Sequence, residues 1–244
     1  MQQKVALVTN ATAYTGPGAV IGLLAEGMVV ACSDAGFVDA DSAREFVAGR
    51  ADAVTFSETE PTLLIARVLE RFGRIDAVVS NDVIPVPLRP IDGSSAADLR
   101  EVLEAGMVYP FELSQCILPH MIGRKSGSII FITSSTARYP MPETAIYGAA
   151  RAAATGYAIA LGQAVAASNI QVNVIGPHWM KNPSYFPDGW EEMMPGFKLK
   201  LDTEVPLRRL GTPNEVGALI GLLASQRAMP LTAQFIAFAA GAYP

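Results

Sequence analysis

The sequence predicts one domain over residues 1–244 with an α/β fold, in which a single doubly wound parallel sheet carries helices on both faces. Its 244 residues are 50% hydrophobic and 17% charged, which suffices to bury one large core. Short apolar, β-branched runs alternate with longer stretches of helical period, as in βαβ units. The runs are apolar at consecutive positions, which indicates strands that are buried on both faces, as in a parallel sheet.

The apolar runs give the predicted strands in chain order. They cover residues 5–9, 28–32, 75–79, 128–133, 170–175 and 234–238. The stretches between them predict helices over 17–27, 62–71, 97–122, 146–167 and 213–225. The last helix has the clearest start, because Thr212 is a suitable N-cap, Pro213 suits the first turn and Glu215 can complete a capping box.

Residues 176–211 do not continue this alternation of strands and helices. The stretch is rich in aromatic residues, Met and Pro, including Trp179, Met180, Tyr185, Phe186, Trp190, Met193 and Met194. A long irregular segment after the carboxyl end of a strand more often covers a site than links two domains. We therefore expect residues 176–211, the lid segment, to cover a site.

Composition argues against several classes of function. The formal net charge is −5 and no run of Lys or Arg occurs, so nucleic acid is not an expected partner. The apolar stretch 19–32 contains Glu26 and is too short to span a membrane, and the N-terminus does not resemble a secretion signal, so we expect a cytoplasmic protein. Cys32 and Cys116 are expected to be reduced core thiols, and no metal site is expected, because two cysteines and two histidines lack zinc-ligand spacing.

The turn after the first predicted strand reads Thr9-Asn10-Ala11-Thr12-Ala13-Tyr14-Thr15-Gly16-Pro17-Gly18. In a doubly wound sheet this turn normally carries glycines, so that the backbone can approach a pyrophosphate. The chain here resembles the short-chain dehydrogenase/reductase superfamily, whose Rossmann-like fold has the loop T-G-x-x-x-G-x-G. Asn10 and Tyr14 replace the first two glycines, and only Gly16 matches. Because the Tyr14 ring would project into the space of the dinucleotide, no cofactor is expected.

Two neighbouring features keep an alternative open. Asp34 follows the second strand, where an acidic residue would hold an adenosine ribose, although an Asp after a strand is also an ordinary turn residue. Residues 80–83 read Ser-Asn-Asp-Val, where these reductases usually carry N-N-A-G. The alternative function is therefore an unusual nicotinamide-dependent reductase, and a catalytically silent binding protein on the same fold is the third interpretation.

The catalytic signature of this superfamily is a Ser at a strand end, then a Tyr, then a Lys one helical turn after the Tyr. This chain has Ser134, Tyr147 and Arg151 at these positions. Positions 147 and 151 share one face of a helix, so the guanidinium can lie beside the phenol. A Tyr and an Arg at this spacing are by themselves more often a solvent-facing pair, but the Ser and the downstream Gly176-Pro177 make the constellation specific. The Asn that reductases often carry on the preceding helix is replaced around Gly106.

The lost glycines, the aromatic residue at position 14 and the Ser, Tyr and Arg set resemble one branch of the superfamily, the halohydrin (haloalcohol) dehalogenases. The likeness covers almost the whole chain. It implies conversion of vicinal haloalcohols to epoxides, and the reverse ring opening by halide or other small anions, with no cofactor or metal. Tyr147 would take the hydroxyl proton, Ser134 would hydrogen-bond the same oxygen, and Arg151 would stabilise the phenolate.

The resemblance also implies a halide site in the space that the nicotinamide would occupy. Its expected walls are Tyr14, Pro177, His178, Trp179 and Met180, with Tyr185 and Phe186 lining the substrate pocket. His178 is the less favoured base, because Tyr147 and Arg151 already supply the proton chemistry. The lid aromatics are equally consistent with core packing under a long loop. Superfamily members usually form tetramers through their long helices, so a homo-oligomer is expected by resemblance.

Overall fold

A computed structural model describes residues 3–82 and 91–242 of the chain. This part is organised around a parallel sheet of seven strands in the order β3-β2-β1-β4-β5-β6-β7. The strands are β1 (Val5–Val8), β2 (Val29–Ser33), β3 (Ala53–Phe56), β4 (Ala77–Ser80), β5 (Gly127–Ile132), β6 (Ile170–Pro177) and β7 (Gln234–Phe238). The strand order reverses between β1 and β4, and ligands of such sheets bind beyond the carboxyl ends of the strands.

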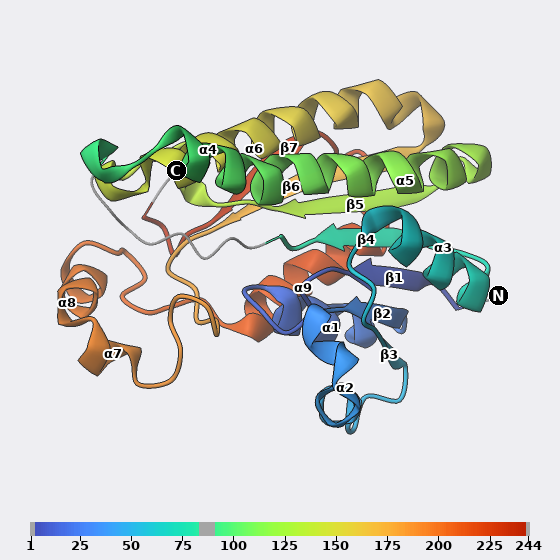
Figure 1. The fold of residues 1–244 in the computed structure, drawn as a ribbon, viewed down its shortest axis with the longest axis horizontal. Helices are drawn as coiled ribbons and strands as arrows, with labels where there is room; N and C mark the ends of the chain where they lie inside the picture. The colour runs from blue at the N-terminus through green and yellow to red at the C-terminus, as the bar shows by residue number, and fades with distance from the viewer. Residues whose placement is uncertain (1–2, 83–90, 243–244) are drawn as a thin grey trace.

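Helices cover both faces of the sheet (Figure 1). They are α1 (Gly16–Ala25), α2 (Ala40–Val47), α3 (Pro61–Phe72), α4 (Ala96–Leu103), α5 (Tyr109–Arg124), α6 (Ala145–Val165), α7 (Trp190–Met193), α8 (Pro195–Thr203) and α9 (Pro213–Ala224). The cluster on one face joins Val8 to Ile220 of α9, and the cluster on the other joins Leu7 to Ile117 of α5. Successive residues of a strand therefore pack in the clusters on opposite faces of the sheet. The strands are buried on both faces, as the sequence predicts.

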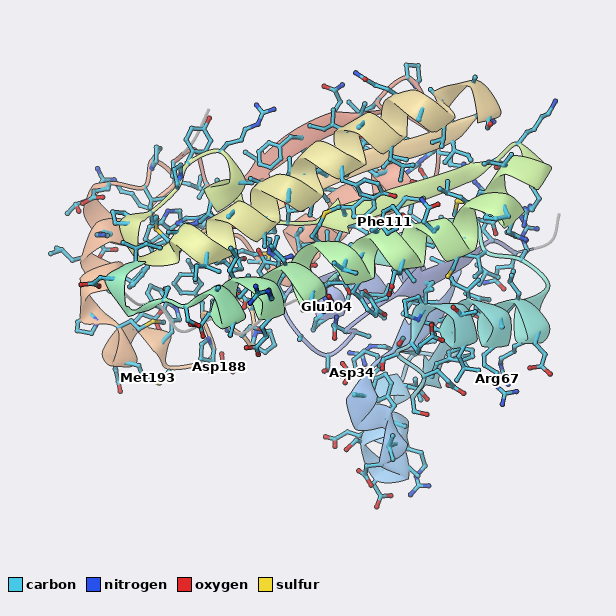
Figure 2. The ribbon with its side chains drawn as sticks, turned by 45° about the horizontal axis from the view of Figure 1, so that its top comes forward. Asp34, Arg67, Glu104, Phe111, Asp188 and Met193 are labelled. Atoms are coloured by element: carbon cyan, nitrogen blue, oxygen red, sulfur yellow. The ribbon has the colours of Figure 1, made fainter. Side chains whose placement is uncertain are left out.

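The predicted fold class is confirmed, and each predicted strand is present with ends shifted by a few residues. Four elements were not predicted: α2, β3 and the lid helices α7 and α8, which lie in the segment expected to be irregular. Helix α2 has no fully buried side chain, in β3 only Ala53 is buried, and α7 and α8 each bury one side chain, so none of them gives a continuous apolar run. The predicted helix over 97–122 is confirmed as an unbroken helical stretch over residues 96–124, in which a π-helical turn at Glu104–Val108 lies between α4 and α5 (Figure 2).

The start of α9 confirms the predicted capping box. Thr212 Oγ1 accepts the Glu215 N–H at 3.3 Å, and a Glu215 carboxylate oxygen accepts the Thr212 N–H at 2.8 Å. The same carboxylate pairs with Arg209 at 2.7 Å. Hydrogen bonds from Arg209 and from the Thr212 N–H lower the pKa of Glu215 to about 2. The lid segment is therefore anchored at the point where the chain re-enters the main fold.

The lid segment lies beyond the carboxyl ends of the strands and carries α7 and α8 (Figure 1). It has a small apolar core of its own, whose buried members are Trp179, Trp190, Leu201 and Val205. The Phe186 ring lies 6.0 Å from the Trp179 ring and 5.0 Å from the Trp190 ring, between ring centres. Core packing therefore accounts for part of the aromatic content of the lid segment, and Trp190 belongs to that part.

Both cysteines are free thiols. Cys32 is buried in β2, and burial raises its pKa to about 12. Cys116 on α5 is only half-buried, with its Sγ 3.7 Å from Thr62 Oγ1, so the prediction of two core thiols is wrong for Cys116. In the described residues no helix combines the length and the apolar character that crossing a membrane requires. Residues 3–82 and 91–242 also contain no group of three His, Cys, Asp or Glu side chains placed to hold a metal ion.

Candidate active site

A cavity of about 170 Å³ lies between the lid segment and the carboxyl ends of β5 and β6. Its walls are mostly apolar. The lining residues are Tyr14, Ser134, Thr136, Met141, Thr144, Tyr147, Pro177, His178, Trp179, Met180, Asn182, Tyr185, Phe186, Met194 and Phe197. Every residue that the sequence predicts for the site lines this cavity, except Arg151, which is buried against the ring of Tyr147.

Ser134 follows β5 in an extended conformation and is buried. Its Oγ accepts two hydrogen bonds from Thr136, one from the backbone N–H at 3.2 Å and one from the hydroxyl at 2.9 Å. Thr136 also lines the cavity, and the sequence reasoning did not single it out. The Ser-x-Thr spacing at the start of a short helical turn is the signal that would have found it, because Ser side chains commonly cap such turns.

Tyr147 and Arg151 lie on one face of α6, as the spacing predicts. The Arg151 guanidinium carbon is 5.1 Å from the centre of the Tyr147 ring. Both side chains are buried, with Arg151 only 1% exposed, so the interpretation as a solvent-facing pair is wrong. Helix α6 therefore places a phenol at the cavity and a cation directly against that phenol.

Arg151 has few polar partners for a buried cation. Its Nη1 donates to the Ile132 carbonyl at 3.4 Å, whereas Nε and Nη2 have no hydrogen-bond partner within the described residues. It forms no ion pair there either. Burial lowers its pKa, but the neighbouring Tyr147 and Tyr14 raise it, and the pKa lies above the usual value. A permanent positive charge so placed favours a negative charge on an adjacent phenol.

Tyr14 forms a wall of the cavity next to the lid segment. Its backbone is left-handed, with φ of 49°, and its side chain is buried. The hydroxyl donates to the Thr133 carbonyl at 3.3 Å, and the backbone N–H donates to Ser184 Oγ at 3.2 Å. Burial raises the Tyr14 pKa well above its usual value, and electrostatic interaction with the neighbouring Tyr147 and Tyr185 side chains adds to the rise. Tyr14 is therefore a neutral wall, held to β5 and to the lid segment.

The turn after β6 contributes the third wall. The His178 N–H donates to the Phe238 carbonyl, and the Lys181 N–H donates to the Gly211 carbonyl, both at 2.9 Å. These two N–H groups are engaged in holding the turn. Trp179 lies between them with φ of 38°, in the left-handed region. A backbone anion site in this turn would therefore use the N–H groups of Trp179 and Met180, and the N–H of His178 does not contribute.

The His178 side chain is half-buried, with its ring 5.1 Å from the Trp179 ring. Burial lowers its pKa to about 4, so the imidazole is neutral and weakly basic near neutral pH. A base with a pKa far below the working pH is poorly matched to removing a hydroxyl proton. The geometry thus agrees with the preference for Tyr147 over His178.

Tyr185 and Asn182 connect the lid segment to the cavity. The Tyr185 ring meets the Tyr14 ring edge-on, with 5.5 Å between ring centres. Asn182 is buried, and its Oδ1 accepts the backbone N–H groups of Ser184 at 3.0 Å and of Tyr185 at 2.8 Å. Asn182 was not predicted from the sequence. Its signal is an Asx turn, in which an Asn side chain accepts from the backbone two residues on.

The comparisons with known proteins agree on the superfamily. Residues 16–242 match the family model described as enoyl-(acyl carrier protein) reductase. The 3-oxoacyl-[acyl-carrier-protein] reductase FabG of Thermotoga maritima is 26% identical over 99% of this chain and 98% of that protein.

Two solved structures are more similar. One, described as a dehalogenation enzyme, is 32% identical with a TM-score of 0.94 and covers 99% of both chains. The other is a halohydrin dehalogenase (HheC) bound to ethyl (2S)-oxiran-2-ylacetate. It is 36% identical with a TM-score of 0.93 and covers 98% of this chain and 96% of that chain.

The loop after β1 is held by hydrogen bonds within the chain. The Asp34 carboxylate caps Gly36 at 2.9 Å and accepts the Thr12 N–H at 3.1 Å and the Thr12 hydroxyl at 2.6 Å. Asn81 is fully buried, accepts the Thr15 hydroxyl at 2.6 Å, and donates to the carbonyls of residues 10 and 13 at 2.9 Å each. Asp34 is therefore a capping residue that ties down the loop.

Proposed function

The chain belongs to the halohydrin dehalogenases of the short-chain dehydrogenase/reductase superfamily, and we propose that it converts vicinal haloalcohols to epoxides without a cofactor, releasing halide and a proton, and catalyses the reverse ring opening. One observation carries the proposal. Arg151 is buried against Tyr147 and has no ion-pair partner in the described residues. A buried cation of this kind is stabilised when the phenol beside it ionises, which makes Tyr147 a base for a substrate hydroxyl.

The reaction follows from this arrangement. The Tyr147 phenolate takes the proton of the substrate hydroxyl, while Ser134 donates a hydrogen bond to the same oxygen. An electron pair of that oxygen forms a bond to the neighbouring carbon, and the carbon–halogen bond breaks with both electrons leaving on the halide. The attack is intramolecular, so holding the substrate in one conformation supplies much of the rate. In ring opening the same groups return the proton to the epoxide oxygen.

The halide is proposed to leave toward Tyr14 and the turn of Pro177, His178, Trp179 and Met180. The mostly apolar lining excludes water and strengthens the contact between an anion and backbone N–H groups. The positive edges of aromatic rings add to this attraction. Tyr185 and Phe186 would hold the rest of the substrate.

The reductase remains the second candidate, because the relative from Thermotoga maritima is a reductase. Asp34 was its best support in the sequence. In the structure the Asp34 carboxylate already accepts hydrogen bonds from Thr12 and Gly36, and the Tyr14 ring lines the cavity. Halide release by the purified chain with no nicotinamide present decides between the two candidates.

The small-molecule partners of the proposed reaction are a haloalcohol or epoxide and a halide ion. The homotetramer stays a prediction from resemblance. Phe111 on α5 is 41% exposed on the outer surface (Figure 2), and a long-helix interface of that kind would cover it. Sedimentation of the purified chain measures this directly.

Bromide is expected to change the fluorescence of Trp179 saturably at millimolar concentration. A halide site that stabilises the transition state also holds the free ion. Both tryptophans, Trp179 and Trp190, are buried, so linear collisional quenching should be small. Trp179 lines the cavity, whereas Trp190 lies beyond Phe186 in the lid core. Trp190→Phe should therefore keep the saturable signal, and Trp179→Phe should lose it.

The Trp190→Phe variant is the matched control for this titration. A purely linear response in the wild type, or a saturable one carried by Trp190 alone, would place the halide outside residues 177–180.

A further inference from the structure

We propose that Thr136 is a positioning residue that holds the Ser134 hydroxyl as a pure hydrogen-bond donor toward the reacting oxygen of the substrate. This inference rests on the proposed function and concerns the direction of one hydrogen bond within it. Ser134 Oγ accepts from Thr136 twice, from the N–H at 3.2 Å and from the hydroxyl at 2.9 Å. A serine hydroxyl has two acceptor lone pairs and one hydrogen. With both lone pairs engaged, only the hydrogen is left for the substrate.

The turn that carries Thr136 is firmly fixed. Ser134 and Thr136 are each only 4% exposed. The residue between them, Ser135, donates its hydroxyl to the Gly176 carbonyl of β6 at 2.7 Å, which ties the 3₁₀ turn Ser135–Ala137 to the neighbouring strand. Thr136 is therefore held where its two donors face Ser134 Oγ, and the remaining direction of that hydroxyl is restricted.

The chemical consequence is that the direction of each hydrogen bond around the substrate oxygen is fixed. A substrate hydroxyl that cannot donate to Ser134 must donate to Tyr147, which is the proposed base. Ser134 then donates to the substrate oxygen as negative charge develops on it. Hydrogen bonds in a chain polarise one another, so the two bonds that Ser134 accepts strengthen the one that it donates. In ring opening the same donor is aimed at the epoxide oxygen.

The test is a double-mutant cycle of Thr136→Val and Ser134→Ala, with halide release from 1,3-dichloro-2-propanol as the readout. Thr136→Val removes the hydroxyl and keeps the shape. We expect kcat to fall roughly three- to tenfold, the size of one neutral hydrogen bond, with KM little changed. Thr136→Ser should restore most of the loss. In the Ser134→Ala background Thr136→Val should have no further effect beyond about twofold, because coupled residues are not additive.

Two controls separate positioning from general packing. Thr155→Val is the matched control. It removes the buried Thr155 hydroxyl, which lies 3.0 Å from the Thr133 hydroxyl, and Thr155 does not line the cavity. It should leave kcat unchanged. Bromide affinity should also be unchanged in Thr136→Val, because the proposed halide turn is not altered.

The outcomes are distinct. An unchanged or increased kcat in Thr136→Val, or the same loss in both backgrounds, overturns the role of Thr136 while the proposed function stands. No halide release from the wild type overturns the proposed function, and the role of Thr136 falls with it.

Discussion

Replacing Tyr147 with Phe is expected to abolish halide release, with a loss of roughly 10²- to 10⁴-fold, the usual contribution of a general base. The variant lacks the oxygen that takes the proton and keeps the buried ring, so the fold should be retained. Initial rates of halide release and a thermal melt of both proteins measure this.

Tyr157→Phe is the matched control for that variant. Tyr157 also lies on α6, and its hydroxyl contacts Ser114 at 2.7 Å and Gln115 at 3.2 Å, away from the cavity. It should release halide at the wild-type rate. If Tyr147→Phe retained activity within a few-fold of the wild type, Tyr147 would not be the base.

Replacing Arg151 with Gln is expected to lower kcat strongly and to move the acid limb of the pH profile upward. The pKa of Arg151 is lowered by burial and raised by Tyr147, Tyr14 and Tyr185, with a net rise, so the guanidinium stays charged over the whole working range. The upward shift is expected because the cation that favours a negative charge on the proposed base is gone. Arg151→Lys should shift the limb in the same direction by less, because it retains a positive charge.

Other titratable groups lie near this pair. Tyr14 and Tyr185 have pKa values raised by burial, and His178 has a pKa of about 4. The buried Asp82 carboxyl has its pKa raised by burial to about 6 and also interacts with Arg151. Arg151 lowers the pKa of Asp82, so an Asp82 limb would also move upward when the cation is lost. An acid limb that did not move in either Arg151 variant would contradict the role of Arg151.

The strands and the pairing of Tyr147 with Arg151 could be predicted from the sequence because their signals are local. Buried parallel strands leave continuous apolar runs, and Tyr147 and Arg151 are brought together by one turn of one helix. Elements without such a signal were missed. Helix α2 has no fully buried side chain, and the π-helical turn before α5 lies within an otherwise continuous helical stretch.

The supporting residues of the site were harder to predict, because their roles depend on contacts between distant segments. Asn81 fills the loop after β1 from the end of β4, and Asn182 orders the lid segment through its own backbone. A single Asn in a sequence does not identify such a partner. The burial of Arg151 is a tertiary effect too, since the spacing alone is equally typical of a solvent-facing pair.

Halide release from 1,3-dichloro-2-propanol, with and without added NADPH, tests cofactor-independent dehalogenation most directly. We expect the purified chain to release one halide ion for each epoxide formed, at the same rate in both conditions, because Tyr147, Ser134 and Arg151 supply all the proton chemistry. No halide release without NADPH, together with NADPH-dependent turnover of a carbonyl substrate, would contradict the proposal and identify the chain as a reductase.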